Sequence, residues 1–298
     1  MAEYDFLLLE RNWEDGAGVI FPELSVYRNW VNVMSKLAFV SSADGDHMQA
    51  LARFRVADRL ILQLKHIPGV IAGVVHSSMT SILVNQIMAS AYQTNDPRYE
   101  WFLIKTMKDT AVPNWKSIYQ FQIVEMFQSI EISKLPKGYE RFGMSESEAE
   151  IPPAGLAVAE LRMSQGNVKA DIVAGVVEKV RSTRLPLEQQ RIAISNANFK
   201  IMSSLLAYPI VAKVLELPLE DDTEFKISYF SKELEVVTEA FRRCLHQAPG
   251  KTPEPLNDLI IPISNVPIKA WTDDKQSLHL EVQRFDRDEP RVFTFSRV

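Results

Sequence analysis

The chain has 298 residues, of which 46% are hydrophobic and 24% charged, and its formal net charge is −5. This composition excludes a disordered chain, a collagen-like repeat and a polycationic nucleic-acid tail. The length allows either one large domain or two smaller ones, each with a substantial apolar core.

The single cysteine, Cys244, excludes an intrachain disulfide, so packing must hold the fold together in a reducing compartment. Arg242 and Arg243 beside it could activate the thiol. A small, half-buried apolar residue at the end of a helix is the favoured interpretation.

The first residues, Met1 to Asp5, lack the positive start of a signal peptide. The longest apolar zone, residues 67–75, is interrupted by Pro68, Gly69 and Gly73 and does not reach the length of a membrane span. We therefore expect no membrane partner and a cytoplasmic location.

Apolar residues recur at intervals of three and four through the first half of the chain, which is typical of amphipathic helices. This pattern predicts helices over residues 24–40, 47–66, 97–108 and 114–130, and one more that follows Ser77-Ser78. The apolar stripe predicted for the first helix is Leu24, Val26, Tyr27, Trp30, Val31, Met34, Leu37 and Ala38. Residues 119–123 alternate in the manner of a strand, but we favour a helix there.

The clearest linker covers residues 133–153, where Pro136 and Gly138 precede an acidic run at 145–150. Helical periodicity then resumes over residues 153–166, 168–183, 186–207 and 232–246. Before the last helix, the segment from Phe225 to Phe230 is interpreted as a short strand, and Ser231 as the helix cap that follows it.

The last fifty residues change character. Five prolines between Pro249 and Pro267 exclude helix. Alternation over 278–282 and 292–298, with a turn between them, predicts a terminal β-hairpin. The fold class is therefore mainly α, with two helical lobes and a β-rich C-terminal tail, α+β overall. We expect both chain ends to be held in place by neighbouring subunits.

The domain division that follows has four parts. They are an N-terminal helical lobe (1–135), a linker (136–153), a C-terminal helical lobe (154–248) and the β-rich tail with its hairpin (249–298).

No motif for catalysis or cofactor binding is present. The 11 glycines form neither a dinucleotide fingerprint nor a phosphate loop, and no G-x-S-x-G elbow occurs. The densest set of potential metal ligands, Asp44-Gly45-Asp46-His47, is better interpreted as a turn with a helix cap. We predict no catalytic residue, no metal and no cofactor.

Two groups of arginines are candidate contacts for nucleic acid. Arg53, Arg55 and Arg59 share the predicted helix 47–66, and the second group, Arg181, Arg184 and Arg191, surrounds the turn at Leu185-Pro186. Two lobes that brought these groups together would form a basic groove for single-stranded nucleic acid. The alternative is that each group is an ordinary solvated helix face.

A set of short stretches resembles one known family. The stretches are Thr80 to Tyr92, Trp101, Val112-Pro113-Asn114-Trp115-Lys116, Leu135-Pro136-Lys137-Gly138-Tyr139-Glu140 and Met144-Ser145-Glu146. Their order is similar to the arm and extended-loop region of tailed-phage major capsid proteins and covers residues 79–150, about a quarter of the chain.

The match departs from the family pattern at Asn114 and Lys137, and the family's strand and spine-helix pattern is not evident after Pro153. The resemblance implies a shell-forming subunit with a β-arm at 115–135. That arm conflicts with the helix favoured over 114–130.

These observations favour a non-enzymatic, self-assembling structural protein, such as a viral capsid or nucleocapsid subunit, found in the host cytoplasm or the virion. Its main partner would be a second copy of itself. One alternative is a nucleoprotein that binds single-stranded RNA between the lobes. Another is an enzyme with a dispersed site, which would require a deep pocket with convergent titratable residues.

Overall fold

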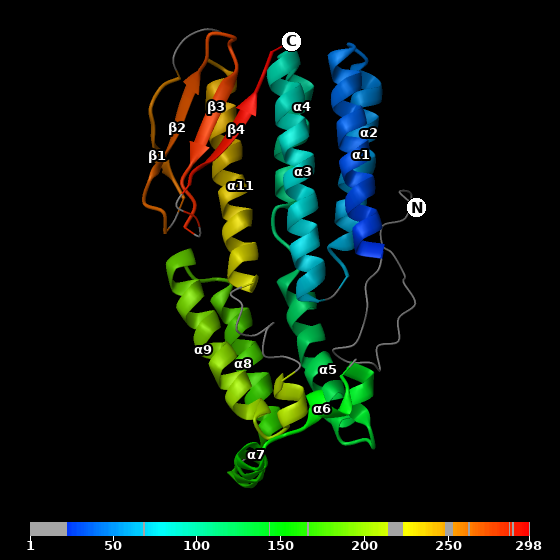
Figure 1. Ribbon diagram of the computed structural model, residues 1–298. Coiled ribbons are helices and arrows are strands. Elements are labelled where there is room, and N and C mark those ends of the chain that lie inside the picture. Colours follow the sequence, from blue (N-terminus) through cyan, green and yellow to red (C-terminus); the bar gives the residue numbers. More distant parts are fainter. Residues whose placement is uncertain are drawn as a thin grey trace.

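The structure is a computed structural model. It describes residues 23–67, 69–142, 144–165, 167–213, 223–247, 253–261, 263–285, 287 and 289–297. Long helices run along the molecule, and a small antiparallel sheet lies against one side of its upper half (Figure 1). The prediction of a mainly helical chain with a β-rich C-terminal tail is confirmed.

Five long helices form the upper half of the molecule. They are α1 (Glu23–Ala43), α2 (His47–Leu64), α3 (Val70–Thr94), α4 (Pro97–Thr110) and α11 (Thr223–Leu245). α3 lies at the centre and packs against all four of the others. Its buried residues therefore lie on several sides: Met79 and Met88, nine residues apart and so on opposite sides of the helix, are both fully inaccessible.

The lower half contains α5 (Trp115–Ser133), α8 (Val168–Ser182) and α9 (Leu187–Leu205), with a 3₁₀ turn (Gly138–Phe142), α6 (Glu146–Ala149) and α7 (Pro153–Gln165) at its end (Figure 1). A second hydrophobic cluster forms where α5, α8 and α9 meet. Gly175 of α8 allows the closest approach, because a Cβ there would lie 2.6 Å from a side-chain carbon of Ile201.

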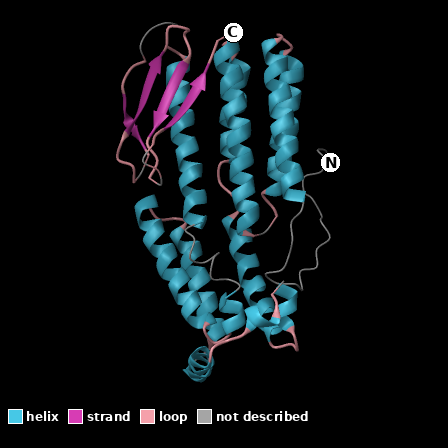
Figure 2. Cartoon of the chain, viewed as in Figure 1, coloured by secondary structure: helices cyan, strands magenta, loops and turns pink. Residues whose placement is uncertain are grey.

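The sheet contains β1 (Leu256–Ile260), β2 (Pro267–Thr272), β3 (Leu278–Val282) and β4 (Arg291–Phe295), antiparallel and in that order (Figure 2). The predicted terminal hairpin is confirmed as β3 and β4, with Leu280 opposite Phe293. The alternating apolar residues of both strands face α11, where the ring of Phe295 lies 4.9 Å from that of Phe241.

Two predictions for the segment before the last predicted helix are wrong. The segment from Phe225 to Phe230 is helical, and Ser231 lies inside α11, where its hydroxyl donates to Ile227 O at 2.9 Å. Because α11 lies between α3, α9 and the sheet, Phe225, Ile227 and Tyr229 are all buried although they alternate in sequence. Burial on several sides produces the strand-like pattern.

The third helix begins at Val70 rather than after Ser77-Ser78. Gly69 precedes it with φ at 105°, a backbone conformation that glycine adopts without strain. The helix is also long and apolar enough to span a membrane, which the sequence inspection did not identify. In this fold it is the central helix of the bundle, with 44% of its most apolar window buried.

The helix favoured over 114–130 is confirmed, since α5 is continuous from Trp115 to Ser133. Asn114 caps it, because its Oδ1 accepts from Ser117 N at 3.2 Å. The β-arm that the capsid resemblance implies at 115–135 is therefore not formed.

The two hydrophobic clusters do not follow the chain in two successive blocks. The first cluster joins α1 to α4 with α11, the sheet and two residues of α9, while the second joins α5, α8 and α9. The division at 136–153 stays a prediction. The expectation that both termini are held concerns residues 1–22 and Val298, which lie outside the described residues.

A buried ion pair connects the two halves. Lys179 Nζ of α8 lies 2.7 Å from Glu224 Oε1 of α11 and 3.4 Å from Gln122 Oε1 of α5. The side chains of Lys179 and Glu224 are at most 1% exposed. Removing two charges from water costs several kcal/mol per ion, so each charge depends on the other for compensation.

We predict that Lys179→Met or Glu224→Met alone lowers the free energy of unfolding by about 3–5 kcal/mol, because either change leaves an uncompensated buried charge. The double variant should lose less than either single one. Urea denaturation measures all three. The matched control is the exposed pair of Lys200 and Glu178, 3.0 Å apart on the neighbouring helices. Its single variants should change stability by less than about 1 kcal/mol. Equal losses at the two pairs would contradict the prediction.

Candidate functional site

The three arginines of α2 have different roles in the structure. Arg53 Nη1 donates to Leu37 O at 2.9 Å and to Ser41 Oγ at 2.5 Å, so it ties α2 to α1. Arg55 and Arg59 are exposed.

The second group lies around the α8–α9 turn, close to the start of α11. Arg181 and Arg184 are exposed at the end of α8, and Arg191 of α9 lies over the ring of Phe225 at 5.9 Å. α2 packs against α1, α3 and α4, whereas α8 packs against α5 and α9 (Figure 1). The structure therefore does not bring the two arginine groups together into one groove.

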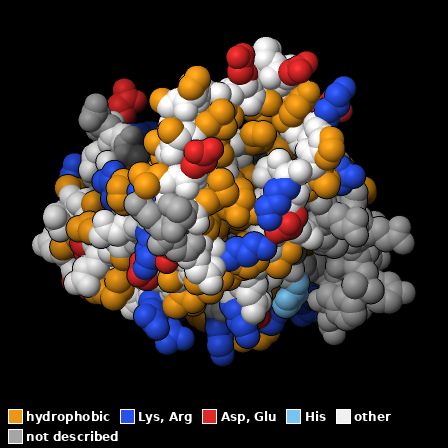
Figure 3. All heavy atoms as spheres, turned by 90° about the horizontal axis from the view of Figure 1, so that it is seen from below, with side chains coloured by type: hydrophobic (Ala, Val, Ile, Leu, Met, Phe, Trp, Pro, Cys, Tyr) orange, Lys and Arg blue, Asp and Glu red, His pale blue; other side chains and the backbone are white. Residues whose placement is uncertain are grey.

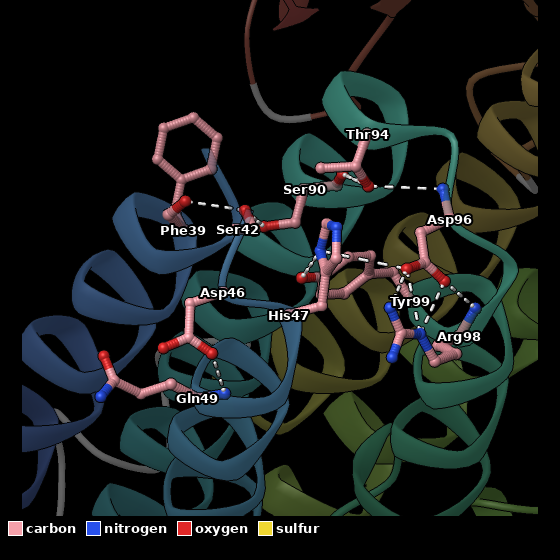
Figure 4. A network of polar contacts seen from close by, with 10 residues as sticks. All are labelled: Phe39, Ser42, Asp46, His47, Gln49, Ser90, Thr94, Asp96, Arg98 and Tyr99. Atoms are coloured by element: carbon pink, nitrogen blue, oxygen red, sulfur yellow. Dashed lines mark hydrogen bonds and ion pairs between the residues drawn. The ribbon is translucent and has the colours of Figure 1, made fainter. Parts of the chain in front are cut away.

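The turn at Asp44–His47 is part of a polar network that fixes the ends of four helices (Figure 4). Asp46 caps α2 by accepting from Gln49 N at 3.0 Å, which confirms the interpretation as a turn with a cap. His47 Nδ1 lies 3.0 Å from the hydroxyl of Tyr99 and 3.9 Å from Asp96 Oδ2.

Two ionisable side chains of this network, Asp96 and Tyr99, have shifted pKa values. Hydrogen bonds from Arg98 hold the pKa of Asp96 below its usual value, and burial raises the pKa of Tyr99 to about 12. Neither group is then poised to exchange a proton near neutral pH. Across the described residues, no three His, Cys, Asp or Glu side chains gather in a way that could hold a metal ion.

Cys244 is 7% exposed, and burial raises the pKa of its thiol to about 11. A reactive cysteine requires the opposite shift, because the thiolate is the nucleophile. The buried apolar interpretation of this residue is therefore confirmed.

An exposed apolar seam runs along the outer face of α1. It consists of Val26, Trp30, Val33, Leu37 and Val40, each between 41% and 52% exposed. The stripe predicted for this helix combines residues of two faces, because Val26, Trp30 and Leu37 are exposed while Leu24, Tyr27, Val31 and Ala38 are buried. The helix is apolar on two faces, and its core contacts come from Leu24, Tyr27, Val31 and Ala38.

The spacing of the seam is the signal that could have identified it. Successive members are four, three, four and three residues apart, which is the heptad spacing of helices that pair in coiled coils. Val33 and Val40, which were outside the predicted stripe, complete this repeat.

Further exposed apolar residues lie on α7 and α9. On α7 they are Leu156, Val158, Leu161 and Met163, and on α9 Ile192 and Phe199, at 65% and 76% exposure. Seen from below, hydrophobic side chains cover much of this end of the molecule (Figure 3). Monomeric soluble proteins rarely expose extensive apolar surface, so these faces are candidate interfaces.

A pocket of about 680 Å³ lies between α3 and α11. Arg28 of α1 and Arg291 and Phe293 of β4 contribute to its wall. Titratable side chains converge on it, as the enzyme alternative requires. The described lining residues include no His, Cys, Tyr or Asp, so an enzyme at this pocket would have to use its serine and threonine hydroxyls with Lys226 or Glu233.

No protein-family model, curated protein or solved structure matches this chain. The functional argument therefore depends on the residues and surfaces described above.

His76 of α3 gives a testable pH dependence. It is 1% exposed, and burial, assisted by the charge of Lys65, lowers its pKa to about 4. Its pKa in an unfolded chain is about 6.5, so between these values the unfolded state binds a proton that the folded state does not. The free energy of unfolding should therefore fall as the pH is lowered through this window, by about 3 kcal/mol from His76 alone.

The variant His76→Gln should lose this share of the pH dependence. Urea denaturation at pH 7 and pH 4 measures it as the difference between wild type and variant. His66→Gln removes an exposed histidine and is the control. An unchanged slope in His76→Gln would refute the assignment.

Proposed function

We propose that this protein is a non-enzymatic, self-assembling structural subunit whose copies pair through the α1 seam. The observation that carries the proposal is the exposed heptad repeat from Val26 to Val40. Its five side chains are all apolar and lie on one face of a helix whose opposite face is already buried.

A second copy is the partner that this seam suits best. The seam contains no charged residue, so its partner must present an apolar helix face with the same three-and-four spacing. The α1 seam of another copy meets that requirement. Two identical patches related by a twofold axis form a closed, isologous contact.

The seam alone gives a weak contact. Burying the remaining half of five apolar side chains on each of two copies contributes about 10 kcal/mol. Association costs roughly 4–15 kcal/mol in lost translational and rotational freedom. Stable assembly therefore requires more surface, which α7 and α9 supply.

The position of these surfaces favours an assembly larger than a dimer. α1 lies along one edge of the upper half, while α7 and α9 lie in the lower half (Figure 1). β4 adds an edge strand of the sheet, a further site for pairing with another chain. A subunit with several separate interfaces can extend into a shell or a filament. A viral capsid or nucleocapsid subunit is the specific form that we propose.

The nucleoprotein alternative has less support, because its two arginine groups lie on helices that belong to different packing groups, α2 with α1, α3 and α4, and α8 with α5 and α9. The enzyme alternative rests on the pocket alone, whose described lining residues include no His, Cys, Tyr or Asp.

We predict that the double variant Trp30→Glu/Val33→Glu lowers the oligomeric state, because it places charges at the centre of the apolar seam. Light scattering coupled to size-exclusion chromatography measures the mass, and electron microscopy shows whether particles or filaments form. Asn29→Glu adds a charge to an exposed position of the same helix outside the seam and is the control.

The wild type and Asn29→Glu should share the same mass and the same particles. A wild type that remains monomeric at every concentration, with no particles by microscopy, would rule out the proposal. Circular dichroism confirms that each variant is folded.

A further inference from the structure

The pocket between α3 and α11 has the size and the walls of a small-molecule site. Its volume of about 680 Å³ lies within the range of roughly 300–1,000 Å³ that is usual for such sites. Helix α3 and helix α11 form its long sides, and α1 and β4 contribute to its rim. Four elements that are separated in sequence, α1, α3, α11 and β4, thus build one cavity.

Positive charge is concentrated in this cavity. Among the described lining residues, four carry a positive charge, and one, Glu233, carries a negative charge; the four cations are Arg28, Lys226, Arg284 and Arg291. The chain as a whole has a net charge of −5, so this local excess is opposite in sign to the rest of the protein.

Glu233 lies close to two of these cations, Arg284 and Arg291. It is 2% exposed, and its oxygens lie 3.3 Å from Arg291 Nη1 and 3.8 Å from Arg284 Nε. One carboxylate thus lies between two guanidinium groups. The guanidinium groups are also stacked, Arg284 over Phe230 at 4.7 Å and Arg291 over Phe293 at 4.4 Å. Stacking fixes the planes of these groups, which prepares them for planar oxyanions.

Hydroxyl and amide groups line the α3 side of the pocket. Ser77, Ser78 and Ser81 follow one another along this helix, with Asn85 one turn further on. In the described part of the chain, Ser77 Oγ and Asn85 Oδ1 are buried and have no hydrogen-bond partner. Buried polar atoms without a partner are uncommon in native proteins, and a bound ligand or water commonly satisfies them.

Apolar side chains complete the cavity. Ile82 of α3, Ile227 and Leu234 of α11 and the rings of Phe230 and Phe293 all contribute. A ligand that matches the whole surface therefore needs an anionic group and an apolar body.

We propose that this pocket binds a small organic anion, in which a carboxylate or phosphate is attached to an apolar body. Because Glu233 is engaged with two arginines, we assign the pocket a binding role. This inference is independent of self-assembly, since the α1 seam is not part of the pocket.

Calorimetric titration of the full chain with four probes tests the proposal. Decanoate and decyl phosphate combine an anion with an apolar chain, while decanol and inorganic phosphate each provide one feature. We expect both combined probes to bind, and each single-feature probe to bind at least about tenfold more weakly, because charge-assisted hydrogen bonds and apolar burial both contribute. The ratio between decanoate and decyl phosphate identifies the preferred head group.

Two variants assign the binding to this pocket. Arg28→Gln removes an exposed cation at the rim, and Arg291→Gln removes one that pairs with Glu233. Each should weaken decanoate binding by about tenfold. Arg55→Gln on α2 removes the same charge outside the pocket and should leave the affinity unchanged.

Three results would overturn the proposal. They are no binding of either combined probe, equal affinity for decanoate and decanol, and equal weakening by Arg55→Gln and Arg28→Gln. The self-assembly variant Trp30→Glu/Val33→Glu should bind decanoate as the wild type does, which separates the two proposals.

Discussion

Lys179 and Glu224 form an ion pair at the junction of α5, α8 and α11, with almost no access to water. A charge buried in this way is tolerated only while its partner and hydrogen bonds stay in place. The pair therefore fixes α8 of the lower cluster against the start of α11, which belongs to the upper cluster. Tyr119 of α5 lies in the same region, and burial together with the charge of Glu224 raises its pKa well above the usual value. This contact joins the two halves, together with Leu187 and Ile194 of α9, which pack into the upper cluster.

The same arrangement explains where the functional surfaces lie. α11 leaves the ion pair and runs between α3 and the sheet, so it supplies one wall of the pocket and the platform on which β3 and β4 pack. α3 is in contact with α1, α2, α4 and α11, and these helices bury many of its apolar side chains. α1, at the edge of the bundle, has a buried face against α2 and α3 and an apolar face that nothing in the described structure covers.

Two kinds of surface then suggest two kinds of partner. The α1 seam is apolar and regularly spaced, which suits another helix with the same spacing. The pocket between α3 and α11 is concave and partly apolar, and its described lining residues carry more positive than negative charge, which suits a small anion. The arginines of α2 and of the α8–α9 turn are separated by the bundle, so their charge is distributed over two surfaces and does not form one groove.

The local sequence pattern was sufficient to predict an element wherever that element has one buried face. The helix periods of α2, α4 and α8, the capping turn at Asp44–His47 and the alternating hairpin of β3 and β4 were all predictable from the sequence, because one-sided burial leaves a clear period. α5 was harder to predict, because residues 119–123 also alternate in the manner of a strand. Elements in contact on several sides were not predictable in this way. Phe225 to Phe230 resembles a strand but is helical, because α11 is buried between α3, α9 and the sheet.

Only the tertiary structure decided which apolar face of α1 is buried, since both faces carry a helical period and the packing of α2 and α3 selects one of them. The pocket has the same origin, because Arg28, Ser81, Lys226 and Arg291 are distant in sequence and meet only when the bundle and the sheet have formed.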